Sequence, residues 1–167
     1  MQTFLLAFLH FVSIYYHKMP IEERYLLPIA IYQGVHRDFK VACTFTAISL
    51  CESGMKCRKW FPNVKQNMDC CGTHNETLCL ELWREHLITD SKHYRKSRQW
   101  KLWRKLFQKR PDIGTMVAAE AFSRLADKHG LEKAIQLWKT GRTGTVPGIL
   151  YAMQVDTLRD GMMKHRR

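Results

Sequence analysis

The sequence predicts an all-α or mainly α protein. Apolar residues recur along most of the chain at the 3.6-residue spacing of amphipathic helices, whereas the alternation typical of half-buried strands is weak throughout. Helix boundary signals accompany this spacing, because Gly130 and Gly141 each follow an apolar segment, as helix C-caps do. We expect at most one small hairpin, in the cysteine-rich region.

The composition fits one folded domain with a basic surface. The chain has 167 residues, and its 46% apolar and 25% charged residues exclude wholesale disorder. The 27 Lys and Arg against 15 Asp and Glu give a net charge of +12. Such a charge predicts an anionic partner: nucleic acid, anionic lipid, or a bacterial wall rich in carboxylates and phosphates. Composition does not choose among these three.

The first 16 residues are strongly apolar, and Pro20 ends the segment. They match a signal-peptide core in hydrophobicity but lack its basic start and its small-residue cleavage site. They are also shorter than the roughly 20 residues that span a bilayer. Three readings stay open: a helix packed in the core, an uncleaved membrane or partner-docking anchor, or a removed signal peptide. We divide the chain into an apolar N-terminal helix at 1–19, an anchor or docking segment, and a domain at 20–167 with a basic insertion at about 88–110.

The helices of the domain can be placed in order from their local signals. A helix at 20–34 carries Glu22 and Glu23 in its first turn, where acidic side chains suit the helix dipole. Asp38 is a candidate cap for the next helix, at 39–51, which ends near Gly54. Residues 55–78 look irregular. The remaining segments are expected as helices at 80–87, 92–110, 115–129 and 131–138, a loop at 141–147, and a last helix at 148–163.

All six cysteines fall between Cys43 and Cys79. An even, clustered count indicates a disulfide framework or a metal site. No pair has the Cys-x-x-Cys spacing that zinc sites favour, so we favour disulfides over free thiols and place a metal site last. At least one disulfide is predicted if the protein matures outside a reducing cytosol. No metal ion and no cofactor is predicted.

Glu52 is the candidate catalytic residue. On the helix that starts at Phe39, Val41, Phe45, Ile48 and Glu52 share one face, so a carboxylate ends an apolar stripe. It also stands at the negative end of the helix dipole. Both surroundings favour the protonated carboxyl, the form that a general acid needs. The alternative is a boundary glutamate that faces solvent or pairs with a nearby Lys or Arg.

Five motifs occur in an order that resembles a known family. They are Ala47-Ile-Ser-Leu-Cys-Glu-Ser-Gly54, Gly72-Thr-His-Asn75, the small-residue segment Asp112-Ile-Gly-Thr-Met-Val-Ala-Ala119, Trp138-Lys-Thr-Gly141, and Tyr151 in the last helix. In this order and spacing the chain resembles the soluble lytic transglycosylases, whose catalytic domain is related to goose-type lysozyme. Trp138-Lys139 stands where that family has Tyr-Asn.

The resemblance implies a lysozyme-like helical domain that cleaves the glycosidic bond between MurNAc and GlcNAc in peptidoglycan. It implies Glu52 as the single catalytic carboxylate, giving a 1,6-anhydro product. A spare acid facing Glu52, of which Asp69, Glu76 and Glu120 are the candidates, would make the reaction hydrolytic instead. The residues that it implies for substrate binding are Ser53, Gly72, His74, Asn75, Trp138 and Tyr151.

The resemblance also implies a place of action. The substrate lies in the bacterial envelope (periplasm), and the uncleaved apolar start suits a component of a phage virion or a secretion machine, docked through residues 1–19.

The segment from Lys92 to Arg110 holds nine Lys or Arg, with an aromatic stripe of Trp100, Trp103 and Phe107. It predicts contact with an anionic surface or nucleic acid, or else is a core helix with a solvated face. The rival function is a non-enzymatic basic membrane- or nucleic-acid-binding protein on a degenerate lysozyme-like fold.

Overall fold

A computed structural model describes residues 1–15, 19, 21–53, 102, 105–107 and 109–164 of the chain. Several predicted features lie outside the described residues. They are Gly72, His74, Asn75, the cysteines after Cys51, the helix expected at 80–87 and most of the segment from Lys92 to Arg110.

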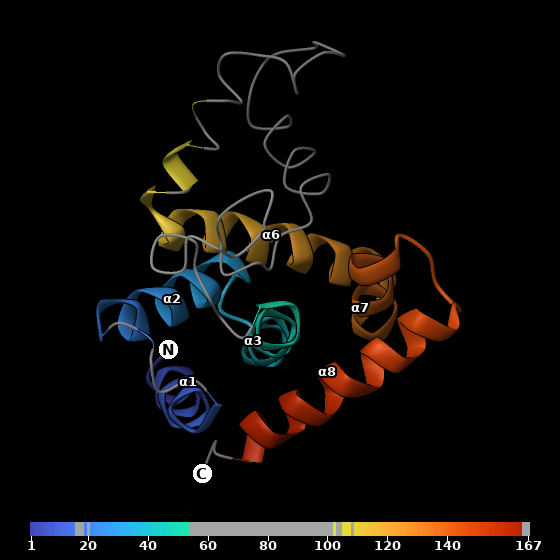
Figure 1. The fold of residues 1–167 in the computed structure, drawn as a ribbon, viewed down its shortest axis with the longest axis horizontal. Coiled ribbons are helices and arrows are strands. Elements are labelled where there is room, and N and C mark those ends of the chain that lie inside the picture. Colours follow the sequence, from blue (N-terminus) through green and yellow to red (C-terminus); the bar gives the residue numbers. More distant parts are fainter. Residues whose placement is uncertain (16–18, 20, 54–101, 103–104, 108, 165–167) are drawn as a thin grey trace.

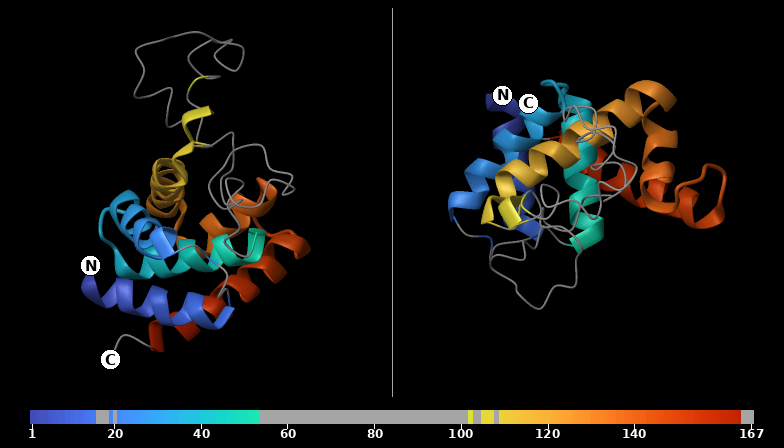
Figure 2. Two further views of the ribbon diagram at one scale, coloured as in Figure 1. Left: turned by 60° about the vertical axis from the view of Figure 1, so that its left-hand side comes forward. Right: turned by 90° about the horizontal axis from the view of Figure 1, so that it is seen from above.

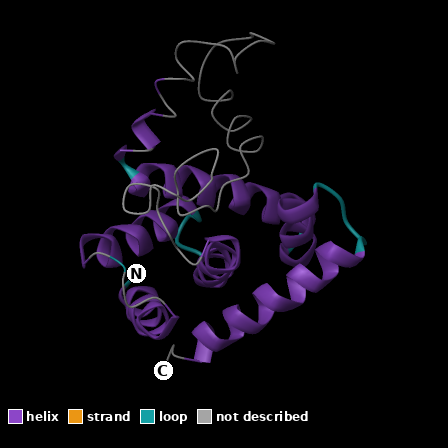
Figure 3. Cartoon of the chain, viewed as in Figure 1, coloured by secondary structure: helices purple, strands orange, loops and turns teal. Residues whose placement is uncertain are grey.

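The described part of the chain is mainly α-helical and contains no strand, which confirms the predicted class (Figure 3). Its helices are α1 (Gln2–Tyr15), α2 (Ile21–Gly34), α3 (Phe39–Ser53), α6 (Pro111–His129), α7 (Leu131–Thr140) and α8 (Val146–Lys164). They follow the predicted order.

Two predicted helix starts were wrong for the same reason. Pro111 and Pro147 lie inside the first turns of α6 and α8, which therefore begin earlier than expected. A proline is tolerated there because the first N–H groups of a helix have no intrahelical acceptor. In α8 the start is further supported by Thr145, whose Oγ1 accepts a hydrogen bond of 3.3 Å from the Gly148 N–H.

Helix α3 lies at the centre of the molecule. Figure 1 shows it nearly end-on, with α1, α2, α6, α7 and α8 around it, and Figure 2 shows the same arrangement from two further directions. Every residue from 42 to 49 is buried. Helix α3 is therefore buried on all sides over this stretch, and the apolar stripe predicted from its sequence covers only part of its buried surface.

The polar groups of this central helix are satisfied within it. Thr44, Thr46 and Ser49 each donate a hydrogen bond to the carbonyl four residues earlier, at 2.8, 2.9 and 2.9 Å. Asp38 caps the helix as predicted, because its Oδ1 accepts a 2.9 Å hydrogen bond from the Val41 N–H. Helix α3 can therefore be buried without leaving these hydroxyl groups unpaired.

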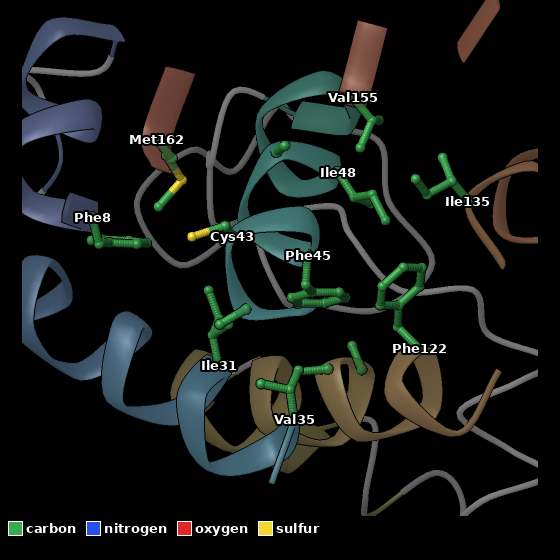
Figure 4. Packing of buried hydrophobic residues seen from close by; sticks show 14 of the residues in the cluster. Phe8, Ile31, Val35, Cys43, Phe45, Ile48, Phe122, Ile135, Val155 and Met162 are labelled. Atoms are coloured by element: carbon green, nitrogen blue, oxygen red, sulfur yellow. The ribbon is translucent and has the colours of Figure 1, made fainter. Parts of the chain in front are cut away.

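The aromatic side chains of three helices meet on one side of α3. Phe45 of α3, Phe122 of α6 and Trp138 of α7 have ring centroids 5.6 to 6.0 Å apart. Figure 4 shows Phe45 and Phe122 among the buried residues between these helices, with Ile135 of α7 close by. These edge-on and tilted contacts fix α7 against α3.

Helix α1 shares this core. Phe4, Phe8 and Phe11 are buried, and the Phe4 ring stacks on Tyr32 of α2 at 5.5 Å. The segment is therefore packed against α2, α3 and α8, which is one of the three readings of its sequence. Leu6 is exposed on the outer face of α1. Docking through this face stays a prediction. Within the described residues, no helix combines the length and the apolar character needed to span a membrane.

Helices α2 and α6 approach each other closely at Gly34. A Cβ atom added there would lie 2.4 Å from the Met116 carbonyl oxygen and 2.8 Å from the Ala119 Cβ. The small residues of α6, of which Ala118 and Ala119 are fully buried, form the matching surface. This contact holds α6 beside α2 at a distance that only a glycine allows.

Candidate functional site

The candidate site lies at the C-terminal end of α3, where the buried central helix reaches the surface. Glu52 is in the last turn of this helix, and its side chain is 23% exposed. Helix α7 brings Lys139 to the same place, and helix α8 brings Tyr151. We call these three residues the Glu52 cluster.

An ion pair connects two members of the cluster. The Lys139 ammonium donates a hydrogen bond of 3.1 Å to Oε1 of Glu52, although 87 positions separate the two residues in the sequence. The ion pair places the Lys139 ammonium directly against the Glu52 carboxylate at the end of α3. Pairing with a Lys or Arg is the predicted alternative to a catalytic Glu52, and the structure contains such a pair.

Tyr151 is the buried member of the cluster. Its side chain is 7% exposed, and the face of its ring lies 4.9 Å from the Lys139 Nζ, within the range of a cation–π contact. Among the described residues its hydroxyl is buried without a well-formed hydrogen bond.

The phenol of Tyr151 nevertheless responds to Glu52. Burial raises its pKa, and the negative charge of Glu52, with the approach of the hydroxyl to the Glu52 carboxylate, raises it further. The hydroxyl is therefore protonated at neutral pH and remains a donor beside the carboxylate.

The pKa of the Cys51 thiol also depends on the charges of the cluster. Burial and the adjacent Glu52 carboxylate raise the pKa of its thiol to about 11, while Lys139 acts in the opposite direction. A neutral thiol is a poor nucleophile and a poor metal ligand. Cys51 carries no disulfide, and the predicted disulfide depends on cysteines outside the described residues.

The structure brings together two of the predicted site residues, Glu52 and Tyr151. Trp138 instead points into the core and is 5% exposed, so it packs the helices rather than lining a surface. Ser53 ends α3, and nothing further is described of its side chain. Gly72, His74 and Asn75 lie outside the described residues.

Of the three spare acids, the structure describes only Glu120, which does not lie beside Glu52. Glu120 forms an ion pair of 2.9 Å with Arg124 on its own helix α6, and Asp69 and Glu76 lie outside the described residues. Across the described ranges, no three His, Cys, Asp or Glu side chains are grouped so that they could hold a metal ion.

Lys139 is the residue that sequence reasoning missed. In the sequence it stands only as a departure from the Tyr-Asn of the resembled family. The sequence around Lys139 does indicate its place, because a residue next to the core-facing Trp138 on a helix lies at the edge of the buried face. A lysine there can extend along the protein surface toward a neighbouring helix end.

No protein-family model matches this sequence, and no curated protein or solved structure shows significant similarity to it. An assignment of function therefore depends on the motifs and on the geometry of the Glu52 cluster.

Proposed function

We propose that this protein is a peptidoglycan lytic transglycosylase with a lysozyme-like fold, in which Glu52 is the single catalytic carboxylate. The observation that carries the proposal is the meeting of Glu52, at the end of the buried helix α3, with Tyr151 from the last helix. The family that the motifs resemble uses a glutamate at a helix end and a tyrosine from its last helix. In this chain Glu52 and Tyr151 belong to motifs that are far apart in the sequence.

The proposed reaction needs one carboxyl group that gives and then takes a proton. Glu52 donates its proton to the glycosidic oxygen as the bond from this oxygen to C1 of MurNAc breaks. The acetamido group of the substrate stabilises the positive centre at C1. The Glu52 carboxylate then accepts the proton of the 6-hydroxyl, whose oxygen bonds to C1 and closes the 1,6-anhydro ring. No water is consumed.

The surroundings of Glu52 are consistent with this single-carboxylate scheme. Most glycosidases use two carboxylates at a set separation. Within the described residues, the side chains that interact with Glu52 are those of Lys139, Tyr151 and Cys51, and none of them is a carboxylate. In the proposed scheme the Tyr151 hydroxyl donates to Glu52 when the proton has left it, which stabilises the ionised intermediate state.

A zymogram on peptidoglycan tests the proposal. The wild-type protein should clear the gel, and Glu52→Gln should lose clearing by about 10²-fold or more, the lower range for a lost acid–base catalyst. Glu132→Gln is the matched control, because it makes the same change at an exposed glutamate of α7. Clearing by the Glu52→Gln variant at the wild-type rate would refute the proposal.

One observation favours the rival function, a basic interaction protein without catalysis. The Glu52–Lys139 ion pair is a common arrangement for a carboxylate at the boundary of a core, and the net charge of +12 suits an anionic partner. The rival predicts no clearing by the wild-type protein, together with salt-sensitive binding to anionic vesicles or to DNA. Binding would then depend on the segment from Lys92 to Arg110 and not on Glu52.

The site of action remains part of the proposal. Peptidoglycan is the predicted partner, so we place the protein in the bacterial envelope or in a phage virion. Docking to a membrane or to a larger assembly through residues 1–19 would use the outer face of α1, where Leu6 and Ile14 are exposed.

A further inference from the structure

We propose that Lys139 is a positioning residue that holds Oε1 of Glu52 and so makes Oε2 the oxygen that delivers the catalytic proton. The proposal rests on the function proposed for Glu52. Lys139 itself touches the carboxylate and the Tyr151 ring, and it acts on the reaction through Glu52.

The argument begins with what an ammonium group can do. It has three N–H donors and no acceptor. The Lys139 ammonium donates to Oε1 at 3.1 Å, and a proton on Oε1 would turn this oxygen into a hydroxyl, which accepts from the ammonium more weakly than a carbonyl oxygen does. When Glu52 is protonated with Lys139 in place, the proton therefore belongs on Oε2. Among the described residues, the neighbouring Tyr151 hydroxyl forms no well-formed hydrogen bond and so does not engage either carboxylate oxygen.

The backbone of Lys139 is fixed relative to Glu52. The preceding residue, Trp138, is buried against Phe45 of α3, the helix that carries Glu52, with ring centroids 6.0 Å apart. Helix α7 ends just after Lys139, where Gly141 adopts φ +68° and its N–H donates to the Leu137 carbonyl at 2.8 Å. The ammonium and the carboxylate are thus presented by two helices that are packed together.

The loop that follows is also held in place. The buried Gln136 accepts a hydrogen bond of 2.8 Å from the Gly144 N–H through its Oε1, and the Thr140 hydroxyl donates to the Arg142 carbonyl at 2.7 Å. The Tyr151 ring lies under the ammonium at 4.9 Å and limits where the lysine side chain can go. These contacts distinguish Lys139 from a lysine that pairs with a carboxylate by chance on a surface.

The first test separates kcat from KM on soluble peptidoglycan glycan strands. Lys139→Met should lower kcat about 10- to 100-fold, the loss expected when a catalytic group is poorly oriented, with KM changed less than about threefold. Lys139→Gln should show the same loss, and Lys139→Arg should recover part of it, because it restores charge and donors. Lys133→Met is the matched control: it removes an exposed lysine from the same helix and should match the wild type.

Three results of this test would overturn the proposal. They are an unchanged kcat in Lys139→Met, a raised kcat, which would make the ammonium an inhibitor of Glu52, and a loss confined to KM. Lys139 is 43% exposed, so its neutral variants should keep the fold, which thermal unfolding checks.

The second test does not depend on activity, because Cys51 reports the charges at Glu52. Lys139 lowers the pKa of this thiol and Glu52 raises it, so at a fixed pH below its pKa of about 11 the thiolate fraction follows both charges. Lys139→Met should slow alkylation of Cys51 by up to about fivefold, and Glu52→Gln should speed it, within the range for a partly exposed charge pair. Mass spectrometry of the peptide that contains Cys51 measures the rate. An unchanged rate in Lys139→Met would show that the ammonium is not at Glu52 in solution.

The two proposals fail in distinguishable ways. If Glu52→Gln still cleaves the wall, the proposed function fails, whatever Lys139 does. If Glu52→Gln is inactive while Lys139→Met has the wild-type kcat, the function stands and the positioning role is refuted.

Discussion

At the scale of single residues, the Glu52 cluster holds a donor for which no described residue is the acceptor. The Tyr151 hydroxyl is buried beside the Glu52 carboxylate but has no well-formed hydrogen bond among the described residues. A buried polar group left in this way costs roughly 1–3 kcal/mol. A role in catalysis would account for this cost, because the hydroxyl lies where it can complete a hydrogen bond to the carboxylate during the reaction.

Tyr151→Phe tests this role. The substitution keeps the ring under Lys139 and removes only the hydroxyl. We expect an unchanged or slightly higher melting temperature, because no complete hydrogen bond is lost, and a rate of wall cleavage lowered by about tenfold, the value of one hydrogen bond to a charged group. Thermal unfolding and a cleavage assay measure the two effects.

Tyr32→Phe is the control for this variant. It removes the same group from a ring that stacks on Phe4 of α1 and should leave cleavage unchanged. A clear loss of stability in Tyr151→Phe would contradict the account, because it would mean that the hydroxyl already has a partner in the resting protein.

At the scale of helices, close packing and local capping decide where each element lies. The approach of α2 to α6 depends on Gly34, where an added Cβ would meet backbone atoms that cannot move aside easily. The start of α6 depends on Pro111 and on the neighbouring Arg110–Asp112 pair, whose side chains form two hydrogen bonds of 2.6 and 2.9 Å.

Gly34→Ala should destabilise the fold by about 1–3 kcal/mol, the usual cost of overpacking a tight contact. Urea unfolding measures this change. Gly161→Ala offers a contrast, because its Cβ would meet only the edge of the Phe11 ring, at 3.2 Å, and a smaller effect is expected. A Gly34→Ala variant as stable as the wild type would show that the two helices are not so close.

The Arg110–Asp112 pair predicts a pH dependence. The hydrogen bonds from Arg110 lower the pKa of Asp112 below its ordinary value of 3.8, so the pair stabilises the fold while Asp112 is ionised. This contribution is present above the ordinary value and is lost as the pH falls through the lowered pKa. The melting temperature of Asp112→Asn should therefore lie slightly below that of the wild type at about pH 7, and the difference should shrink at about pH 3. A difference that stays constant with pH would rule out this assignment.

At the scale of the whole molecule, the chain wraps its other helices around α3. Helices α1 and α8 also meet, because Gly161 of α8 faces the Phe11 ring of α1. The C-terminal end of the central helix is then the place where α7 and α8 bring side chains to Glu52. A carboxylate at this point is supported by rigid elements, as a catalytic group requires.

The helices could be predicted because their signals are local. Asp38 caps α3 and Gly130 and Gly141 end their helices as expected, since each acts on neighbouring backbone groups. The predicted starts of α6 and α8 are too late in the chain, because a proline in the first turn of a helix is tolerated although proline usually indicates a helix end.

The candidate site could be predicted only in part. Glu52 and Tyr151 were singled out by motifs, but the 87 positions between Glu52 and Lys139 put their ion pair beyond any local pattern. Trp138 was expected to bind substrate, yet it is a core residue, because spacing alone cannot tell an aromatic ring that packs three helices from one that lines a surface.

The central claim is that Glu52 drives cleavage of peptidoglycan without adding water. Mass spectrometry of the fragments released from purified cell wall, by the wild type and by Glu52→Gln, tests it most directly. We predict that the wild type releases fragments ending in 1,6-anhydro-MurNAc, each lighter by one water than its hydrolytic counterpart, and that Glu52→Gln releases about a hundredth of this amount or less. Release of the same anhydro fragments by Glu52→Gln in wild-type yield, or release of no wall fragments by the wild type, would contradict the account.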